Sequence, residues 1–142
     1  MSNSKTDPQP CVGVIIFKGD KVLLGKRSGK HASGEYSLPG GRIEYMESFE
    51  EAVKRETLEE AGIKIKNIKF LSVANIDRYS YRHDIGISFS AEWEEGVPQT
   101  FPNERIGNWD WYDMDKLPEP IFYPTSITID SYKTSKNFYD KE

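Results

Sequence analysis

The segment from Ser48 to Gly62 carries signals for both ends of a helix, and it constrains the fold more than any other part of the chain. Ser48 and Glu51 have the spacing of a capping box, in which each side chain accepts a hydrogen bond from the other residue's backbone amide. The residues that follow are mostly good helix formers, and Gly62 can take the left-handed conformation that ends a helix. We therefore predict a helix that begins after Ser48 and continues to Ala61.

The apolar face of this predicted helix is continued by carboxylates. At about 100° per residue, the residues on one stripe and its flank are Phe49, Ala52, Val53, Glu56, Glu59 and Glu60. Burying an ionised carboxylate is costly unless it is paired, and glutamates one turn apart repel each other. A divalent cation such as Mg2+ removes both costs, because it binds carboxylate oxygens. The alternative is a solvated helix face whose glutamates pair with Lys54 and Arg55.

The net charge of -4 is concentrated in the same part of the chain. Between residues 42 and 60 there are seven glutamates against three basic residues, so this stretch holds the whole excess. Such a concentration attracts cations and repels phosphate backbones. We therefore expect no nucleic-acid groove, and we expect a polyphosphate substrate to bind through metal ions.

The length of 142 residues suits one domain that folds without a disulfide. We expect this domain at residues 11–135, with a flexible N-terminal segment at 1–10 and a C-terminal tail at 136–142. Cys11 is the only cysteine and is expected to be a small buried hydrophobic residue. No apolar run approaches the ~20 residues that span a bilayer, and the first ten residues are polar, so we predict a cytoplasmic protein without membrane contact.

Alternating and β-branched segments predict a sheet around the helix. Residues 11–17 and 21–24 should form a hairpin across Gly19-Asp20. Further strands are predicted at 36–38, 63–76, 85–93 and 109–112, loops at 25–34 and 96–107, and a helix from Pro124 onward. Pro39-Gly40-Gly41 is expected to be a breaker whose backbone can take positive φ angles and approach a ligand closely.

One stretch of 23 residues matches a known pattern. Gly41 is followed after five residues by Glu47, and after seven more by Arg55-Glu56-Thr57-Leu58-Glu59-Glu60-Ala61-Gly62-Ile63. This stretch resembles the Nudix box: every fixed polar and glycine position is filled, and the one departure is Thr57, where an aliphatic residue is usual. Residues 22–27, 37–41, 109–112 and 117–118 are also similar to the MutT-like branch of the Nudix hydrolases, small enzymes that act on nucleoside triphosphates.

The resemblance implies an α/β/α sandwich with a central mixed sheet, in which the box forms a loop-helix-loop at the substrate cleft. It also implies attack of water on phosphorus with Mg2+ or Mn2+ as cofactor. The metal ligands implied by position are the Gly40 carbonyl, Glu56, Glu59 and Glu60.

The same resemblance implies roles for other residues of the box. Arg55 should orient a carboxylate, either Glu47 or Glu56, and Gly41 should border the substrate. The general base is left open between Glu59 and Glu60. These roles fit the chemistry of phosphoanhydride cleavage, which needs positioning and charge stabilisation more than covalent work by the protein.

Other candidates lie outside the box. Glu104 is either an extra metal ligand or an exposed loop charge, and Lys26 and Arg27 either contact phosphates or form a solvated strand end. His31 and His83 are expected to be ordinary surface residues. Aromatic residues that can stack on a base or simply pack in the protein are Tyr36, Tyr79, Phe101 and Trp109.

Hydrolysis of a nucleoside triphosphate to the monophosphate and pyrophosphate is the leading functional hypothesis. Cleavage of ADP-ribose or another nucleotide sugar is the alternative within the enzyme class. A non-catalytic nucleotide-binding module is the alternative of another class, but it would be expected to have lost a box carboxylate. A homodimer is suggested only by the resemblance.

Overall fold

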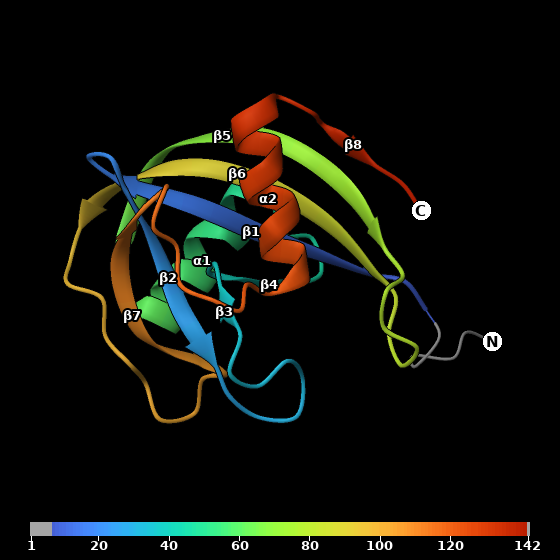
Figure 1. The fold of residues 1–142 in the computed structure, drawn as a ribbon, viewed down its shortest axis with the longest axis horizontal. Helices are drawn as coiled ribbons and strands as arrows, with labels where there is room; N and C mark the ends of the chain where they lie inside the picture. The colour runs from blue at the N-terminus through green and yellow to red at the C-terminus, as the bar shows by residue number, and fades with distance from the viewer. Residues whose placement is uncertain (1–6, 142) are drawn as a thin grey trace.

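The computed structural model describes residues 7–141, and Figure 1 shows the arrangement of their helices and strands. The elements in chain order are β1 (Gln9–Lys18), β2 (Lys21–Arg27), β3 (Tyr36–Ser37), β4 (Gly40–Arg42), α1 (Phe49–Ala61), β5 (Lys64–Ile76), β6 (Asp84–Glu95), β7 (Ile106–Asp113), α2 (Tyr123–Thr134) and β8 (Phe138–Tyr139). Neither helix of this described part is long and apolar enough to cross a membrane.

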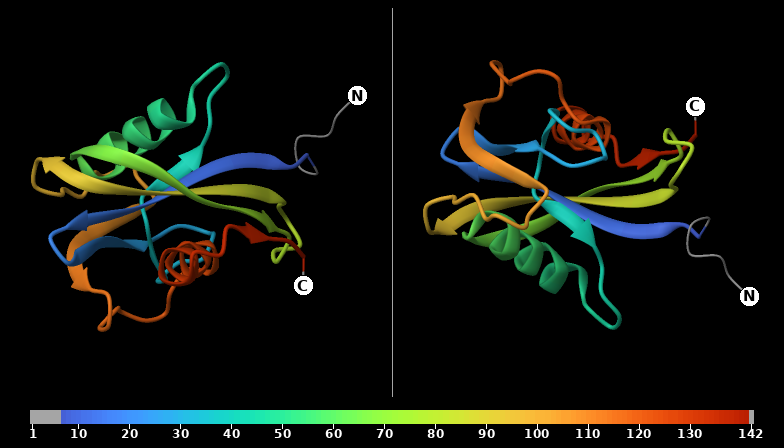
Figure 2. Two further views of the ribbon diagram at one scale, coloured as in Figure 1. Left: turned by 90° about the horizontal axis from the view of Figure 1, so that it is seen from above. Right: turned by 90° about the horizontal axis from the view of Figure 1, so that it is seen from below.

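The strands form one mixed sheet of eight in the order β3-β2-β1-β6-β5-β8, with β4 beside β1 and β7 beside β2. The pairs β1/β6 and β5/β8 are parallel, and the other pairs are antiparallel. Figure 2 shows α1 and α2 on opposite faces of the sheet. The predicted α/β/α sandwich with a mixed sheet is therefore confirmed.

The ends of α1 lie where the local signals predict them. The Ser48 hydroxyl accepts a hydrogen bond from the Glu51 amide at 3.1 Å, and a Glu51 carboxylate oxygen accepts one from the Ser48 amide at 2.9 Å. At the other end Gly62 has φ 73°, and its amide donates to the Leu58 carbonyl at 3.0 Å. These contacts satisfy backbone groups that a helix end would otherwise leave without partners.

The core fills both faces of the sheet. On the α1 side the cluster of buried residues is Val12, Val14, Ile16, Leu23, Ala52, Val53, Ala61, Ile63, Ile65, Phe89 and Ala91. On the α2 side the buried residues are Ile15, Val22, Leu24, Leu38 and Ile129, together with Ala74, Ile76 and Ile127. Because β1 is covered on both sides, its residues form a nearly continuous apolar run instead of a simple alternation.

Several predicted boundaries differ from the observed ones, and strand pairing explains three of the differences. β1 begins at Gln9, inside the segment expected to be flexible, because Gln9 and Pro10 pair with the start of β6; residues 1–6 lie outside the described part. β8 falls in the expected C-terminal tail, where Phe138 pairs with Val73 of β5. β2 continues to Arg27, three residues into the predicted loop, because its last residues pair with β3 and β7.

Two further expectations were wrong: the backbone angles of Gly40 and Gly41, and the set of residues on the buried face of α1. Gly40 and Gly41 do not have positive φ angles; they belong to β4, which pairs with β1. On α1, Phe49 is half exposed, whereas Thr57 is fully buried and donates to the Val53 carbonyl at 2.8 Å. The buried face of the helix therefore includes Thr57 and not Phe49, unlike the predicted face. Burial of Thr57 costs little, because its hydroxyl is bonded to its own helix.

Candidate active site

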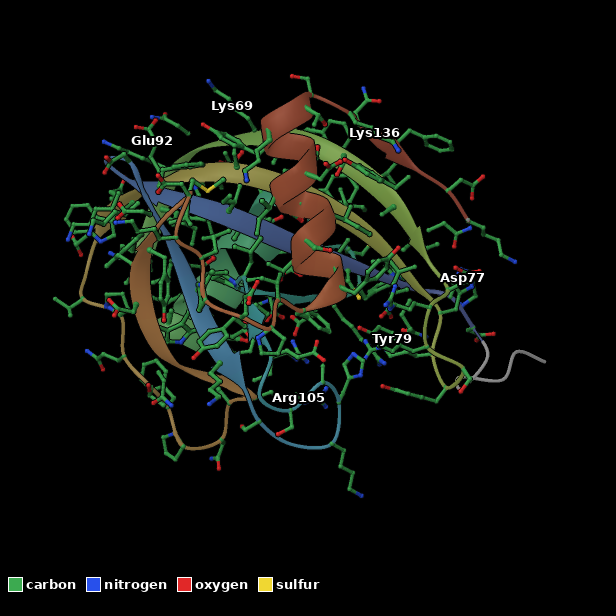
Figure 3. All side chains as sticks on the ribbon, viewed as in Figure 1. Lys69, Asp77, Tyr79, Glu92, Arg105 and Lys136 are labelled. Carbon is green, nitrogen blue, oxygen red and sulfur yellow. The ribbon has the colours of Figure 1, made fainter. Side chains whose placement is uncertain are left out.

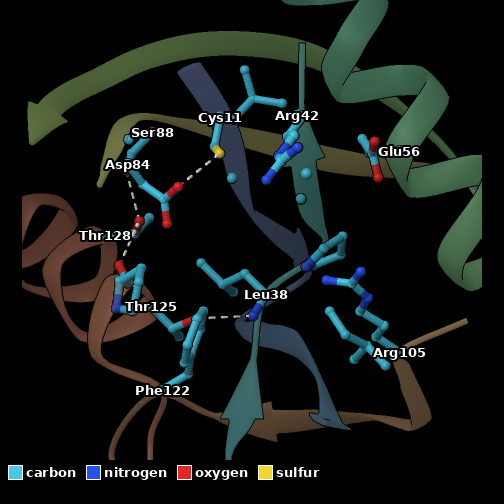
Figure 4. A pocket seen from close by; sticks show the side chains of 18 of the residues that line it. Cys11, Leu38, Arg42, Glu56, Asp84, Ser88, Arg105, Phe122, Thr125 and Thr128 are labelled. Atoms are coloured by element: carbon cyan, nitrogen blue, oxygen red, sulfur yellow. Dashed lines mark hydrogen bonds between the residues drawn. The ribbon is translucent and has the colours of Figure 1, made fainter. Parts of the chain in front are cut away.

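A cavity of ≈ 440 Å³ lies between the sheet, α1 and the first turn of α2. One wall carries the predicted acids Glu56 and Glu60 from α1, and the loop before β7 brings Glu104 to the same cavity. Figure 4 shows Glu56 and Arg105 on one side and Asp84, Ser88 and Thr128 on the other. A cavity of this size, lined by a few convergent polar groups, is suited to a small-molecule ligand.

Glu60 is the most deeply buried of the predicted acids. Glu60 is only 5% exposed, and its Oε1 accepts a hydrogen bond from the Gly40 amide at 2.8 Å. Burial is the main cause that raises the pKa of Glu60 well above its ordinary value, and the neighbouring charges of Glu56 and Glu104 act in the same direction. Burial likewise raises the pKa of Glu56.

Of the two glycines of β4, Gly41 allows the strand to lie close to α1 and Gly40 allows it to lie close to β1. A Cβ on Gly41 would lie 2.5 Å from Cδ of Glu56, and one on Gly40 would lie 2.3 Å from the carbonyl oxygen of Val12. The absence of a side chain, and not an unusual backbone angle, is therefore what these positions require. The contact from β4 to Glu60 is made by the Gly40 amide; a metal-binding role for its carbonyl stays a prediction.

Arg55 is bonded to several carboxylates at once. Its Nε and Nη2 donate to the two oxygens of Glu47 at 2.6 and 2.9 Å, and its Nη1 donates to Glu56 at 2.8 Å and to Glu59 at 3.3 Å. Its Nη2 also donates to the Arg42 carbonyl at 3.0 Å. Hydrogen bonds from Arg55 are the main cause that lowers the pKa of Glu47 to about 2. Arg55 thus contacts both carboxylates that the sequence offered as alternatives.

The predicted acids do not all face the cavity. Glu56, Glu60 and Glu104 line it, whereas Glu47 and Glu59 lie beside Arg55 outside its lining. Within residues 7–141, no three His, Cys, Asp or Glu side chains are already gathered as a metal cage. The donor set nevertheless fits a hard divalent cation, because burial of Glu60 and partial burial of Glu56 disfavour ionisation of these carboxyls until a positive charge is near.

Arginines supply positive charge to the cavity. Arg27 lines it, its guanidinium lies 4.2 Å from the ring centre of Phe122, and its Nε donates to the His31 carbonyl at 3.3 Å. Arg105, which Figure 3 labels, lies in the loop before β7 and also lines the cavity. Lys26 is exposed and lies outside the lining, so the structure brings only Arg27 of the predicted pair to the site.

The side of the cavity near α2 was missed from the sequence. Asp84 and Arg82 form an ion pair there, and Cys11 is only partly buried, with its Sγ 3.9 Å from Oδ1 of Asp84. Burial is the main cause that raises the pKa of Cys11 to about 11, so its thiol stays protonated at neutral pH. Asp84 is the first residue on the polar face of β6, a strand that was expected to be half exposed. The predicted helix after Pro124 was the one feature of the sequence that indicated a cover for this face.

His31 was wrongly expected to be an ordinary surface residue. It lines the cavity, and its ring makes edge-to-face contacts with Tyr79 at 4.7 Å and Phe122 at 5.4 Å between ring centres. Burial is the main cause that lowers the pKa of His31 to about 4. His83, by contrast, is partly exposed and contacts Asn75 outside the cavity lining.

None of the four predicted stacking aromatics lines the cavity. Trp109 packs against Gly25, and its indole nitrogen donates to the Glu60 carbonyl at 3.0 Å, so it supports the end of α1. Phe101 lies close to Gly62. The aromatic residue that does line the cavity is Phe122, for which the sequence gave no separate signal.

Comparison with known proteins identifies the family of this chain. Residues 7–133 match the model of the NUDIX domain family. The NAD-capped RNA hydrolase NudC of Yersinia enterocolitica is 36% identical over 109 residues, which are 77% of this chain but only 40% of that protein. The chain thus spans two fifths of the length of this relative.

Solved structures give the same family. A MutT NUDIX hydrolase from Burkholderia pseudomallei superposes with a TM-score of 0.81 at 30% identity, covering 88% of this chain and 98% of that one. The NUDIX domain of Shewanella oneidensis NrtR, in complex with ADP ribose, superposes with a TM-score of 0.76 at 24% identity, covering 89% and 87%. The match over most of the chain, together with the box carboxylates gathered around Arg55 and the cavity, shows that this protein belongs to the Nudix hydrolase family.

Proposed function

We propose that this enzyme hydrolyses a phosphoanhydride bond in a nucleoside diphosphate linked to another group, with a nucleoside triphosphate as the preferred substrate. The products would be the nucleoside monophosphate and pyrophosphate. The observation that carries the proposal is the buried carboxylate of Glu60 beside the partly buried carboxylate of Glu56, on one wall of a cavity that Arg27 and Arg105 also line. Carboxylates for metal and arginines for phosphate are the two components that such a reaction needs.

Mg2+, with Mn2+ as a substitute, is the proposed cofactor. Glu56 and Glu60 would hold it, with Glu59, Glu104 and the Gly40 carbonyl as further ligands. The metal would lower the pKa of a bound water and stabilise charge on the phosphate oxygens. Arg55, bonded to Glu56, fixes that carboxylate in place.

The remaining roles follow from position around the cavity. Glu60 or Glu59 is the proposed general base; Glu60 has the better position because it lines the cavity, whereas the Glu59 side chain is 50% exposed. Glu47 would act through Arg55, whose guanidinium it binds by two bonds. Arg27 would contact the phosphates, and Gly41 would let the substrate pass close to β4. Lys26, on the exposed side of β2, is a weaker candidate for a phosphate contact.

Cleavage of ADP-ribose or another nucleotide sugar is the second candidate. The ADP ribose bound to the NrtR domain favours it, and the NudC relative is named for a capped RNA whose cap contains NAD. This reaction would release a nucleoside monophosphate and a sugar phosphate, so the products separate the two candidates. A silent binding module is disfavoured because Glu47, Glu56, Glu59 and Glu60 are all present.

The proposal extends to partners and location. We propose a cytoplasmic enzyme with a nucleotide-type substrate, no nucleic-acid or membrane partner, and a possible homodimer. The charge excess of residues 42–60 supports the absence of a nucleic-acid groove.

The test is a panel of nucleoside triphosphates, ADP-ribose and other nucleotide sugars, assayed with Mg2+ and with the products resolved by chromatography. Glu60→Gln should lower turnover by at least ~100-fold with the fold intact. Glu50→Gln is the matched control, because Glu50 is exposed on the same helix and pairs only with Lys54 among the described residues. Wild-type turnover in Glu60→Gln would remove this residue from the site, and the absence of hydrolysis across the panel would refute the proposal.

A further inference from the structure

The side of the cavity away from α1 holds a charged pair that the proposed hydrolysis does not use. Asp84, the first residue of β6, is only 6% exposed. Nε of Arg82 donates to its Oδ2 at 2.8 Å, and Nη2 of Arg82 donates to its Oδ1 at 3.2 Å. Figure 4 shows the Asp84 carboxylate facing the cavity from the side opposite to Glu56. A ligand held at Glu56 can therefore extend towards Asp84.

The Asp84 carboxylate keeps capacity to accept another hydrogen bond. An ionised carboxylate has about four acceptor positions, and Arg82 fills two of them. The Cys11 thiol is a weak donor at 3.9 Å from Oδ1. At least one strong acceptor position remains for a donor inside the cavity. Because the bidentate pair fixes the carboxylate, its direction is set before a ligand binds.

The walls around Asp84 suit a flat ring. Gly13 presents no side chain to the cavity, and a Cβ there would meet only the Pro39 carbonyl oxygen at 4.0 Å, so a ring can lie close to the backbone of β1. Ile76, whose Cδ1 fills the place of a side chain at Gly86, and Ile127 add apolar surface beside it. The hydroxyls of Ser88 and Thr128 also lie on this side, where they bond to each other. Apolar walls with a few fixed polar groups are typical of sites that bind a small molecule and determine its orientation.

We infer that Asp84 determines substrate specificity, by accepting a hydrogen bond from an exocyclic amino group on the ring of the bound nucleotide. The inference rests on the proposed function for the class of ligand, a nucleotide. A ring that carries a carbonyl oxygen at the same place would direct that oxygen at the carboxylate and bind less well. Adenine, cytosine and a ring carboxamide share the required amino group, whereas hypoxanthine and uracil have a carbonyl there.

The first experiment measures binding to the wild-type protein by calorimetry without added metal, using two pairs of monophosphates. AMP is compared with IMP, and CMP with UMP, because in each pair the amino group is replaced by a carbonyl; the adjacent ring nitrogen gains a hydrogen in the same change. Hydrogen bonds to a charged group correspond to roughly a 10- to 100-fold change in affinity, so at least one amino nucleotide should bind at least ~10-fold more tightly than its carbonyl partner. Equal affinities within both pairs overturn the inference.

The second experiment asks whether Asp84 causes the preference. In Asp84→Asn the side-chain amide can donate as well as accept a hydrogen bond. The affinities for the amino and the carbonyl nucleotide should therefore differ by no more than about 2-fold. Asp20→Asn makes the same chemical change in the exposed β1–β2 turn and should keep the wild-type preference. If Asp84→Asn does not fold, Arg82→Lys tests the same pair, because lysine cannot hold the carboxylate by two bonds. An unchanged preference in the folded variant overturns the assignment to Asp84.

A third arm separates this inference from the proposed function. Glu60→Gln should keep the amino preference in the binding assay while it loses hydrolysis. An amino preference in a protein that hydrolyses nothing would refute the proposed function alone. Hydrolysis without any amino preference would refute the role of Asp84 alone.

Discussion

The backbone amide of Gly40 donates a hydrogen bond of 2.8 Å to the carboxylate of Glu60. This bond joins β4 to α1 at the wall of the cavity, and it accompanies the contact between Gly41 and the Glu56 carboxylate. The positions of both buried acids therefore depend on how closely the strand approaches the helix. Substitutions at the two glycines should separate the effect on the site from the effect on the fold.

Gly41→Ala should mainly damage the site. Its Cβ would lie 2.5 Å from Cδ of Glu56, and that carboxylate is the end of a flexible side chain that can move away. A displacement of about 1 Å at a reacting centre can cost ~100-fold, so kcat/KM should fall by about that factor with a small change in melting temperature. Wild-type kcat/KM in a folded Gly41→Ala protein would show that Glu56 does not need this contact.

Gly40→Ala should instead destabilise the fold. Its Cβ would lie 2.3 Å from the backbone carbonyl oxygen of Val12, which cannot move without disturbing the pairing of β1 with β4. Overpacking of this kind costs about 1–3 kcal/mol. Urea unfolding should show a loss in this range, clearly larger than the loss in Gly41→Ala; equal stability of the two variants would contradict the distinction.

Arg55→Lys should lower activity although it conserves the charge. Lysine cannot make the two parallel bonds to Glu47 and also reach Glu56, so the carboxylates would no longer be held in place. We expect kcat to fall by ~10- to 100-fold, since Arg55 contacts the acids from behind the cavity. Lys54→Arg, on the exposed side of the same helix, is the control and should have no effect. An Arg55→Lys protein with normal kcat would show that charge alone suffices.

The sequence predicted those features whose causes are local. The ends of α1 follow from Ser48, Glu51 and Gly62, because each makes its capping contact within the same helix. The strands follow from alternation, and the placing of Glu60 on a buried face follows from helical periodicity. Thr57 lay outside the predicted buried stripe but is fully buried, as a threonine can be when its hydroxyl is bonded within the helix.

The far side of the cavity could not be predicted, because it is formed by contacts distant in the sequence. Asp84 lies on the polar face of an alternating strand, and such a face is the same in sequence whether water or α2 covers it. The parallel pairing of β1 with β6 then brings Cys11 beside it. The glycines of β4 were expected to allow a turn, but their function is to leave space for a carbonyl and a carboxylate, which no local pattern shows.

Gly62→Ala should destabilise the end of α1. Gly62 has φ 73°, and a Cβ would also meet the Phe101 ring at 3.2 Å. A non-glycine residue in this left-handed conformation costs about 1 kcal/mol, which for a chain of this length lowers the melting temperature by roughly 3–5 °C. Gly62→Asn should lose less stability than Gly62→Ala from the backbone conformation, because asparagine tolerates the left-handed region. A higher melting temperature for Gly62→Ala than for Gly62→Asn would contradict this explanation.

The environment of His31 predicts a dependence of stability on pH. Its ring is packed against Tyr79 and Phe122, and its Nδ1 lies 2.5 Å from the Tyr81 hydroxyl. The pKa of His31 is lowered to about 4, from 6.5, so the folded protein holds a neutral ring where the unfolded chain binds a proton. The contribution to stability is therefore fully present above about pH 6.5 and is lost as the pH falls towards about 4.

His31→Phe isolates this contribution, because it keeps an aromatic ring that cannot titrate. The free energy of unfolding, measured by urea titration, should fall less steeply in the variant than in the wild type between about pH 6.5 and about pH 4. The difference should reach about 1 kcal/mol, since the ring is only partly withdrawn from water and solvent screens the charge. Carboxylates titrate in both proteins and cancel in the comparison. Parallel curves for the two proteins would mean that His31 is protonated as readily in the folded state as in the unfolded chain.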